Sequence, residues 1–225
     1  MSACSVALWR DGGVDAKNFV AMERGQSEAL VPTIMEVLSK AGTGFPDLDL
    51  IAVTTGPGAF TGIRIGLAAA RGMALAANLP CLGVTTLEVI AEGAGRHRTS
   101  ASTVLVVLNA KRKDVYAQAF SAALEPAGPP RAVLAGDLAG MVAVPQGDGE
   151  PVVVVGDATG EAVAALDCSG VAAIPCDAPG ISDAAVVAAI AARRWRAGMV
   201  PPVPSPLYLR PPDATLPRNG GRRRP

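Results

Sequence analysis

The chain has 225 residues, half of them hydrophobic, and its 20 lysine and arginine residues are balanced by 20 acidic ones. A formal net charge of zero argues against a dedicated, charge-driven binder of nucleic acid or of anionic membranes. The length suits one large domain or two small ones, and either arrangement can bury a core without disulfide bonds.

The cysteines are scattered, with no Cys-x-x-Cys pair, and His97 is the single histidine. We therefore expect free thiols in a reducing compartment and no structural zinc site. The four thiols belong to Cys4, Cys81, Cys168 and Cys176.

Neither a secretory signal nor a membrane span is predicted. Residues 1–13 reach Arg10 and Asp11 almost at once, which is unlike the basic and then apolar order of a signal peptide. The longest apolar tract, 63–84, is interrupted by polar residues and a proline, so it does not suit a bilayer. We expect a soluble, cytoplasmic protein.

Hydrophobic periodicity predicts an α/β unit in the first 98 residues. An apolar run at 5–9 leads into a glycine turn, which predicts a hairpin with a partner strand near 17–22. From Ser27, which can cap a helix, apolar residues recur at helical spacing as far as Ala41. The following elements are predicted as a strand at 50–55, a loop at 56–62, a helix at 63–77, a strand at 81–84 and a helix at 86–93. This alternation is typical of parallel crossover units.

A polar linker at 95–102 separates this unit from a second one, so we expect domains at 1–98 and 99–210. In the second domain we predict strands at 103–109 and 115–120, a long connection at 125–149 with a short helix at 135–141, a strand at 152–156, a helix at 159–166, a strand at 171–174 and a helix at 182–195. Residues 211–225, rich in proline and arginine, are expected to be a disordered tail.

The most informative stretch, residues 53–66, reads VTTGPGAFTGIRIG. Glycines between a strand and a helix are what a phosphate-binding loop needs, because backbone N–H groups must face the anion. However, Gly62-Ile63-Arg64 stands where a P-loop has Gly-Lys-Ser/Thr, and Thr61 stands where a dinucleotide fingerprint has its third glycine. Spacing alone favours a tight turn that lets the helix pack on the sheet.

Few residues suit catalysis. His97 lies in the polar linker without a partner, and no Ser-His-acid or Cys-His arrangement is evident. Five aspartates lie in or near predicted loops, and nothing in the sequence pairs two of them. We therefore interpret them as solvated turn residues and not as catalytic carboxylates: Asp137, Asp148, Asp157, Asp177 and Asp183. The basic residues 111–113 and 222–224 lack interleaved aromatic residues, which favours solvated positions over nucleic-acid contacts. No cofactor or metal is expected.

Six segments together resemble the bacterial TsaB family, also called YeaZ, and the resemblance covers nearly the whole chain. They are residues 3–8 (ACSVAL), Ser27-Glu28, the run GPGAFTGIRIG at 56–66, GVTTL at 83–87, 110–116, and PLYLRP at 206–211. The glycine-rich run is highly specific, and its motif residues are Gly56, Pro57, Gly58, Phe60, Thr61, Gly62 and Arg64.

The resemblance implies two ribonuclease-H-like α/β halves, as in the actin, Hsp70 and sugar-kinase superfamily. It also implies a non-catalytic subunit of the complex that forms threonylcarbamoyladenosine next to the anticodon of tRNAs reading codons that begin with A. The implied partners are the catalytic paralogue TsaD in a heterodimer, the ATPase TsaE, and tRNA through the complex. The paralogue holds its metal partly with a His-x-x-x-His pair, which His97 alone cannot reproduce.

The helices at 27–41 and 63–77 carry apolar faces that suit either the core or a helical subunit interface. Given the resemblance, we expect the paralogue to bind both helices, through Leu30, Ile34, Met35, Leu38, Ile65, Ala69 and Met73. Two alternatives stay open. One is a nucleotide-dependent phosphotransferase or metallopeptidase-like hydrolase of the same superfamily, and the other is a homodimer formed through the same helices.

The chain departs from the family pattern at two places. It has Gln26-Ser27-Glu28 where many members have His-Ser-Glu, and Met1-Ser2 directly precedes a strand that family members place second. The first strand of the family is central to its sheet, so its loss leaves the strands at 5–9 and 50–55 without a shared neighbour. Our hypothesis is that the true start lies upstream, which the intact mass of the protein from its native source tests.

Overall fold

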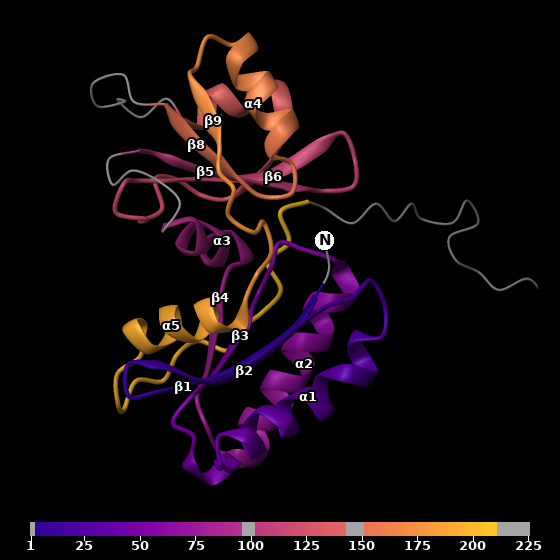
Figure 1. The fold of residues 1–225 in the computed structure, drawn as a ribbon, viewed down its shortest axis with the longest axis vertical. Coiled ribbons are helices and arrows are strands. Elements are labelled where there is room, and N and C mark those ends of the chain that lie inside the picture. Colours follow the sequence, from indigo (N-terminus) through magenta and orange to yellow (C-terminus); the bar gives the residue numbers. More distant parts are fainter. Residues whose placement is uncertain (1–2, 96–101, 143–150, 211–225) are drawn as a thin grey trace, which may run out of the picture.

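Two α/β halves follow one another along the long axis of the computed structural model, with helix α3 (Thr86–Ala94) at their junction (Figure 1). The structure describes residues 3–95, 102–142 and 151–210. The predicted tail at 211–225, most of the predicted linker and His97 lie outside these described residues. The α/β class with two ribonuclease-H-like halves is confirmed.

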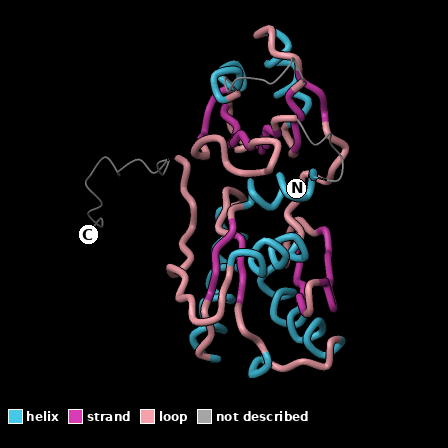
Figure 2. The backbone as a smooth tube through the Cα atoms, turned by 90° about the vertical axis from the view of Figure 1, so that its left-hand side faces the viewer, coloured by secondary structure: helices cyan, strands magenta, loops and turns pink. Residues whose placement is uncertain are grey.

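The first half contains two separate strand pairs. β1 (Ala3–Arg10) is antiparallel to β2 (Gly13–Ala21), whereas β3 (Ile51–Thr54) is parallel to β4 (Cys81–Val84). Figure 2 shows the two pairs on opposite sides of this half. Within the described part of the chain no ladder joins β1 to β3, which confirms that these two strands lack a shared neighbour.

Helices cover both faces of these strands. α1 (Gln26–Lys40) packs on β1 and β2, and α2 (Phe60–Ala77) packs on β3 and β4. The opposite face is covered by α5 (Ala184–Arg194), which contacts both β1 and β3 although it comes late in the chain (Figure 1). The predicted division at residue 98 is therefore wrong for α5, because the apolar side chains of this helix pack beside Leu82 and Val84 of β4.

The second half is built on one five-stranded sheet in the order β7-β6-β5-β8-β9. The central strand, β5, is antiparallel to β6 and parallel to β8. One face carries α3, and the other carries α4 and the 3₁₀ helix η3. The elements are β5 (Val104–Asn109), β6 (Asp114–Phe120), β7 (Arg131–Leu134), η3 (Ala135–Met141), β8 (Val152–Val155), α4 (Thr159–Cys168) and β9 (Ala173–Pro175).

Side chains of β5 alternate between two cores, as expected for a strand covered on both faces. Leu105 and Val107 pack with Leu138 and Leu166, whereas Val104 and Val106 pack with Leu87 and other α3 residues. All four β5 side chains are completely buried. The core of the second half therefore extends to both sides of its sheet.

Most predicted elements are found within a few residues of their expected bounds, with four corrections. α2 begins at Phe60, one turn before the predicted start. Strand β7 was not predicted within 125–149, and the short helix predicted at 135–141 is a 3₁₀ helix. α1 is preceded by Gly25 with no side-chain cap, so the predicted cap at Ser27 is wrong.

Candidate functional site

Helix α1 carries the first group of predicted contact residues. Its start is set by Gly25, whose φ of 90° is left-handed and favours glycine, while Gln26 Nε2 donates to the Met22 carbonyl at 3.0 Å. One side of the helix is fixed by burial against β1. The buried residues of α1 are Thr33, Val37 and Leu38.

The predicted contact residues differ widely in exposure. Met35 is 53% exposed, whereas Leu38 is only 7% exposed. Leu38 therefore belongs to the core, and its assignment as a contact residue is corrected. The other five are half-buried: Leu30, Ile34, Ile65, Ala69 and Met73.

Two exposed apolar side chains on the same helices were not predicted. Val31 on α1 is 47% exposed, and Leu75 on α2 is 84% exposed. Val31 lies four residues before Met35, so the two share one face of the helix. That spacing could have identified the outward face of α1, whereas nothing in the local sequence distinguishes Leu75 from its buried neighbour Ala74.

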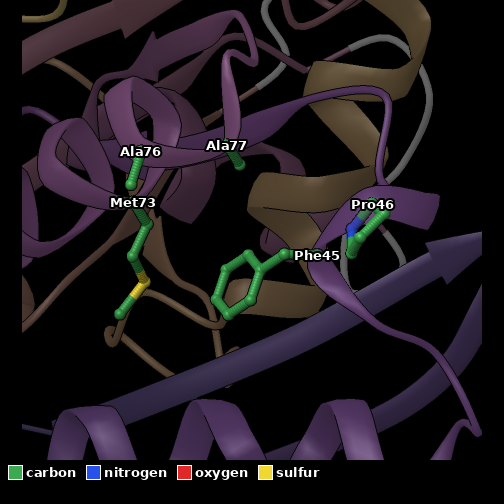
Figure 3. A pocket seen from close by; sticks show the side chains of 5 residues that line it. All are labelled: Phe45, Pro46, Met73, Ala76 and Ala77. Atoms are coloured by element: carbon green, nitrogen blue, oxygen red, sulfur yellow. The ribbon is translucent and has the colours of Figure 1, made fainter.

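An apolar cavity of about 380 Å³ lies where α2 ends, beside the short 3₁₀ helix η1 (Phe45–Asp47). The side chains of Met73 and Phe45 point into the same space (Figure 3). Met73 is thus part of a cavity wall as well as a predicted contact residue. The lining residues are Phe45, Pro46, Met73, Ala76 and Ala77.

The glycine-rich loop joins β3 to α2 through a tightly constrained path. Gly56 and Pro57 are buried, and the φ of Gly56, 106°, favours glycine. A Cβ at Gly58 would lie 3.3 Å from Ile63 Cδ1, so this glycine permits close packing against the first turn of α2. The remaining motif residues are exposed: Phe60, Thr61, Gly62 and Arg64.

Arg64 stacks on the ring of Phe60 and forms a hydrogen bond with Tyr208. Its guanidinium carbon lies 3.3 Å from the Phe60 ring centroid, and Nη2 donates to the Tyr208 hydroxyl at 2.6 Å. The two rings are 6.2 Å apart, centroid to centroid. This stack fastens residues 203–210, the C-terminal strap, to α2. Arg64 therefore has a structural role, which the sequence analysis did not predict.

The described carboxylates named as turn residues include two with clear structural roles. Asp183 Oδ1 caps α5 by accepting from the Ala185 amide at 2.8 Å, and it lies 3.5 Å from Ser5 Oγ. Asp157 Oδ1 accepts from the Asn109 amide at 2.7 Å. Among the described residues, no three His, Cys, Asp or Glu side chains form a metal-binding group. Asp148 lies outside these residues.

The two cysteines of the first half are not activated nucleophiles. Burial raises the pKa of the Cys4 thiol, and the opposing effect of Thr33 is smaller. Burial likewise raises the pKa of Cys81, against a smaller opposing effect of Arg71. Both thiols therefore stay protonated near neutral pH. The described cysteines are free, as predicted.

The basic residues 111–113 form the exposed tip between β5 and β6. Lys111 adopts a left-handed φ of 58°, and its amide donates to Asn109 Oδ1 at 2.6 Å. The tip is thus an ordered turn of the second half, distant in sequence from both candidate helices. In the described part of the chain, no helix is long and apolar enough to cross a bilayer.

Comparisons with known proteins identify the family. The family model of TsaD, tRNA N6-adenosine threonylcarbamoyltransferase, matches residues 20–159. The chain belongs to this family. TsaB of Escherichia coli is 43% identical over 114 residues, which are 51% of this chain and 48% of the E. coli protein. The chain spans about half the length of the curated TsaB relatives it matches.

Other relatives match over a longer stretch. An uncharacterized protein of Mycobacterium tuberculosis is 33% identical over 192 residues, which are 85% of this chain and 78% of that protein. YeaZ from Pseudomonas aeruginosa superposes with a TM-score of 0.76 at 26% identity, covering 92% of this chain and 94% of that one. A second P. aeruginosa structure, described as similar to peptidase YeaZ, gives a TM-score of 0.77 at 27% identity. The resemblance to TsaB and YeaZ is thereby confirmed.

Proposed function

We propose that this chain is a non-catalytic subunit of the complex that forms threonylcarbamoyladenosine in tRNA, and that it binds a catalytic TsaD-type subunit. The observation that carries the proposal is the match to TsaB of E. coli at 43% identity, supported by the superposition on YeaZ. The ATPase TsaE and tRNA are further partners in this proposal. The complex acts in the cytoplasm.

The polar side chains that were candidates for catalysis make contacts that hold the fold together, which supports a non-catalytic role. Asp157 and Asp183 accept backbone hydrogen bonds that hold loops and a helix end. Burial keeps the thiols of Cys4 and Cys81 protonated. Arg64 is engaged by Phe60 and Tyr208. These groups stabilise the fold, and none is poised as a nucleophile or general base.

We infer that the partner binds across α1 and α2. Exposed apolar side chains on both helices support this surface, because a partner would remove them from water. Met35 and Val31 share the outward face of α1. The half-buried Ile34 and Met73 would form the edge of the same contact. Small residues of α2 such as Ala69 permit close helix approach.

Co-purification with tagged chain, followed by mass spectrometry of the bound proteins, tests the proposal. Wild-type chain should recover the TsaD-type subunit, and Met35→Glu should reduce that recovery by about tenfold or more. Leu134→Glu is a matched control, because Leu134 has the same exposed fraction, 53%, but lies in the second half. Ile34→Glu and Met73→Glu test the half-buried edge, with circular dichroism as the check on folding.

Three outcomes contradict parts of this proposal. Retained recovery with Met35→Glu and Met73→Glu would exclude α1 and α2 as the surface. Failure of folded wild-type chain to recover the subunit, combined with ATP binding or hydrolysis by the chain alone, would favour the enzyme alternative. A concentration-dependent dimer in sedimentation, without a TsaD-type partner, would favour self-association through the same helices.

A further inference from the structure

The C-terminal strap brings an aromatic side chain close to residues 111–113, the basic tip between β5 and β6. Arg210 Nε lies 3.0 Å from Asp114 Oδ2, and Asp114 directly follows the tip. Tyr208 is two residues before Arg210, and two residues of extended chain span at most about 7 Å. The sequence favours solvated positions for the basic residues because no aromatic residue lies among them. The structure supplies Tyr208 from the other end of the chain.

Phe60 and Tyr208 offer aromatic ring surface to solvent at the start of α2. Their side chains are 61% and 56% exposed, although phenylalanine is among the residue types most often fully buried. Arg64 covers one face of the Phe60 ring and bonds to the Tyr208 hydroxyl, so both rings are held in place. A ring that is already held loses little conformational freedom when a planar group stacks on it. Exposed rings beside a guanidinium are features with which proteins bind the bases of single-stranded nucleic acid.

The basic tip carries an excess of positive charge. All three of its residues, 111–113, are exposed, and its backbone is an ordered turn with a hydrogen bond to Asn109 Oδ1. Two carboxylates lie next to the tip, and both are engaged. Asp114 pairs with Arg210, and Asp157 accepts from the Asn109 amide. Because Arg210 balances Asp114, the charge of the three tip residues is only partly offset by Asp157.

The segment that follows the C-terminal strap adds further basic residues. Residues 211–225 contain four arginines and one aspartate, and three of the arginines are consecutive, at 222–224. The chain enters this segment at Arg210, beside the basic tip, so two basic segments that are far apart in the sequence start from one place. The neutral total charge argues only against binding driven by the whole molecule. A local group of lysines and arginines still attracts phosphate groups.

This surface is separate from the one proposed for the TsaD-type subunit. Arg64 lies near the start of α2 and the exposed Leu75 near its end, about 16 Å apart along the helix axis. The exposed Val31 and Met35 lie on α1. The C-terminal strap instead connects the start of α2 with β6 of the second half (Figure 1). The chain can therefore contact RNA and a protein partner at the same time.

We propose that Phe60, Tyr208 and the basic tip at 111–113 form a binding surface for a single-stranded segment of RNA. The rings stack on bases, and the basic side chains contact phosphate groups. Duplex RNA suits this surface less well, because its bases already stack on one another. No base sequence is preferred, since stacking accepts every base. The inference rests on the proposed role in tRNA modification, which makes RNA the nucleic acid that the complex handles.

Fluorescence anisotropy of a labelled adenine-rich RNA oligonucleotide, titrated with the full chain at several salt concentrations, tests the surface. Lys111→Asn combined with Lys113→Gln should weaken binding about tenfold and reduce the salt slope by about 1.4, or about 0.7 for each lost phosphate contact. Asparagine tolerates the left-handed φ of residue 111. The matched control, Lys17→Gln with Lys40→Gln, removes two exposed lysines from β2 and α1. It should change binding by no more than about twofold, because salt screens distant charges.

The aromatic part of the surface is tested with two variants of one residue. Tyr208→Ala should weaken RNA binding about tenfold, because one stacked base is lost, whereas Tyr208→Phe keeps the ring and should bind like wild type. Both variants lose the hydrogen bond with Arg64, so a difference between them reports the ring and not the hydroxyl. A blunt RNA duplex of the same length should bind wild-type chain more weakly than the single strand does.

Weaker RNA binding by both the lysine variant and Tyr208→Ala, each shown by circular dichroism to be folded, supports the surface. Wild-type chain that does not bind the oligonucleotide would overturn it, and so would variants that bind like wild type. Binding that depends on the lysines but not on the Tyr208 ring would overturn the stacking role.

Co-purification of the same variants separates this inference from the proposed function. If wild-type chain recovers the TsaD-type subunit but does not bind RNA, the surface is wrong and the proposed function stands. If the lysine variant binds RNA normally but recovers less of that subunit, the basic tip is a protein contact and the surface is again wrong. Loss of both RNA binding and recovery with wild-type chain would overturn both proposals.

Discussion

The two halves show how the burial of a strand depends on its neighbours. β8 (VVVV) is buried at every position between β5 and β9, whereas β3 (IAVT) is fully buried only at Val53. β6 and β1 differ in the same way, because most of β6 is buried and most of β1 is half-buried. β3 and β8 are each the first strand of a parallel pair joined by a helix, and β1 and β6 each belong to the antiparallel pair that comes before it in the chain. The presence of a central strand therefore accounts for the difference better than apolar content alone.

The first half is stabilised by contributions from the end of the chain. α5 covers its strands, and two ion pairs join α3 to α5: Glu88 with Arg194 at 2.6 Å, and Glu92 with Arg193 at 2.8 Å. The Leu207 amide donates to the Thr55 carbonyl at 2.8 Å, which brings the C-terminal strap beside β3. Residues 183–210 thus support a half that lacks a complete sheet, whereas the sheet of the second half is complete without them.

The largest expected difference in stability loss between the halves comes from two glycines in comparable turns. Gly56 follows β3 in the first half and Gly156 follows β8 in the second, and both have a positive φ, 106° and 131°. Gly156→Ala should destabilise the chain by about 4 kcal/mol or more, because the new Cβ would overlap the Val107 carbonyl in addition to the strain of a positive φ. Gly56→Ala should cost about 1–3 kcal/mol, because only the strain applies. Denaturant unfolding measures both losses. Equal losses would show that the backbone surroundings of the two turns are the same.

A smaller effect is expected from truncating matched valines in β6 and β1. Val115 in β6 is 3% exposed, whereas Val6 in β1 is half-buried. Val115→Ala should cost about 2 kcal/mol, and Val6→Ala about 1 kcal/mol, because less apolar area is lost from the incomplete half. Urea denaturation of each variant provides the comparison. A larger loss for Val6→Ala would mean that the first half is the better packed one.

The sequence predicted those elements whose signals are local. The helical spacing of apolar residues located α1, and β4 was predicted with its observed bounds, Cys81–Val84. β7 was missed because four residues within a connection rich in proline and glycine carry almost no periodic signal. Its partner is β6, and pairing with a partner strand is a tertiary effect. The packing of α5 on the first half is a long-range contact of the same kind.

The candidate interface was only partly predictable for a related reason. Apolar residues occur on several sides of α1, so periodicity does not tell which side the strands cover. The structure separates Met35, which is exposed, from Leu38, which packs in the core. Arg64 and Tyr208 are 144 residues apart, and no local pattern predicts their hydrogen bond. The family resemblance rests on the two segments that contain these residues, but it did not reveal their contact.

The link between α3 and α5 should depend on pH. Burial raises the pKa of Glu88. Hydrogen bonds from Arg194 and from the amide and hydroxyl of Thr85 together lower the pKa by more than burial raises it, so the net pKa is below its ordinary value. The folded state therefore gains stability above the ordinary glutamate pKa, about 4.3, and loses it as the pH falls through the folded value. Glu88→Gln should cost about 1–2 kcal/mol near neutral pH.

Unfolding free energies of wild type and Glu88→Gln, measured from pH 7 to pH 3, test this expectation. The difference between them should shrink as the pH falls below about 4.3, because the wild-type carboxylate becomes protonated. A matched control is Glu36→Gln, since Glu36 forms an exposed ion pair with Lys40 on α1 and an exposed hydrogen bond with Asn18. Its effect should be much smaller because solvent screens exposed pairs. Equal losses of unfolding free energy for the two variants would show that the ion pair between Glu88 and Arg194 contributes no more than an exposed pair.

The smallest effects are expected at the C-terminal strap. Tyr208→Phe removes the hydroxyl that accepts from Arg64 but keeps the ring beside Phe60, so it should cost no more than about 0.5 kcal/mol. Tyr208→Ala also removes the stack and should cost about 1 kcal/mol. If the strap supports the incomplete half, Tyr208→Ala should speed hydrogen exchange at β3 and β4 while leaving β5 and β8 unchanged. Faster exchange in β5 as well would mean that the strap stabilises both halves together, through the ion pair of Arg210 with Asp114 in β6.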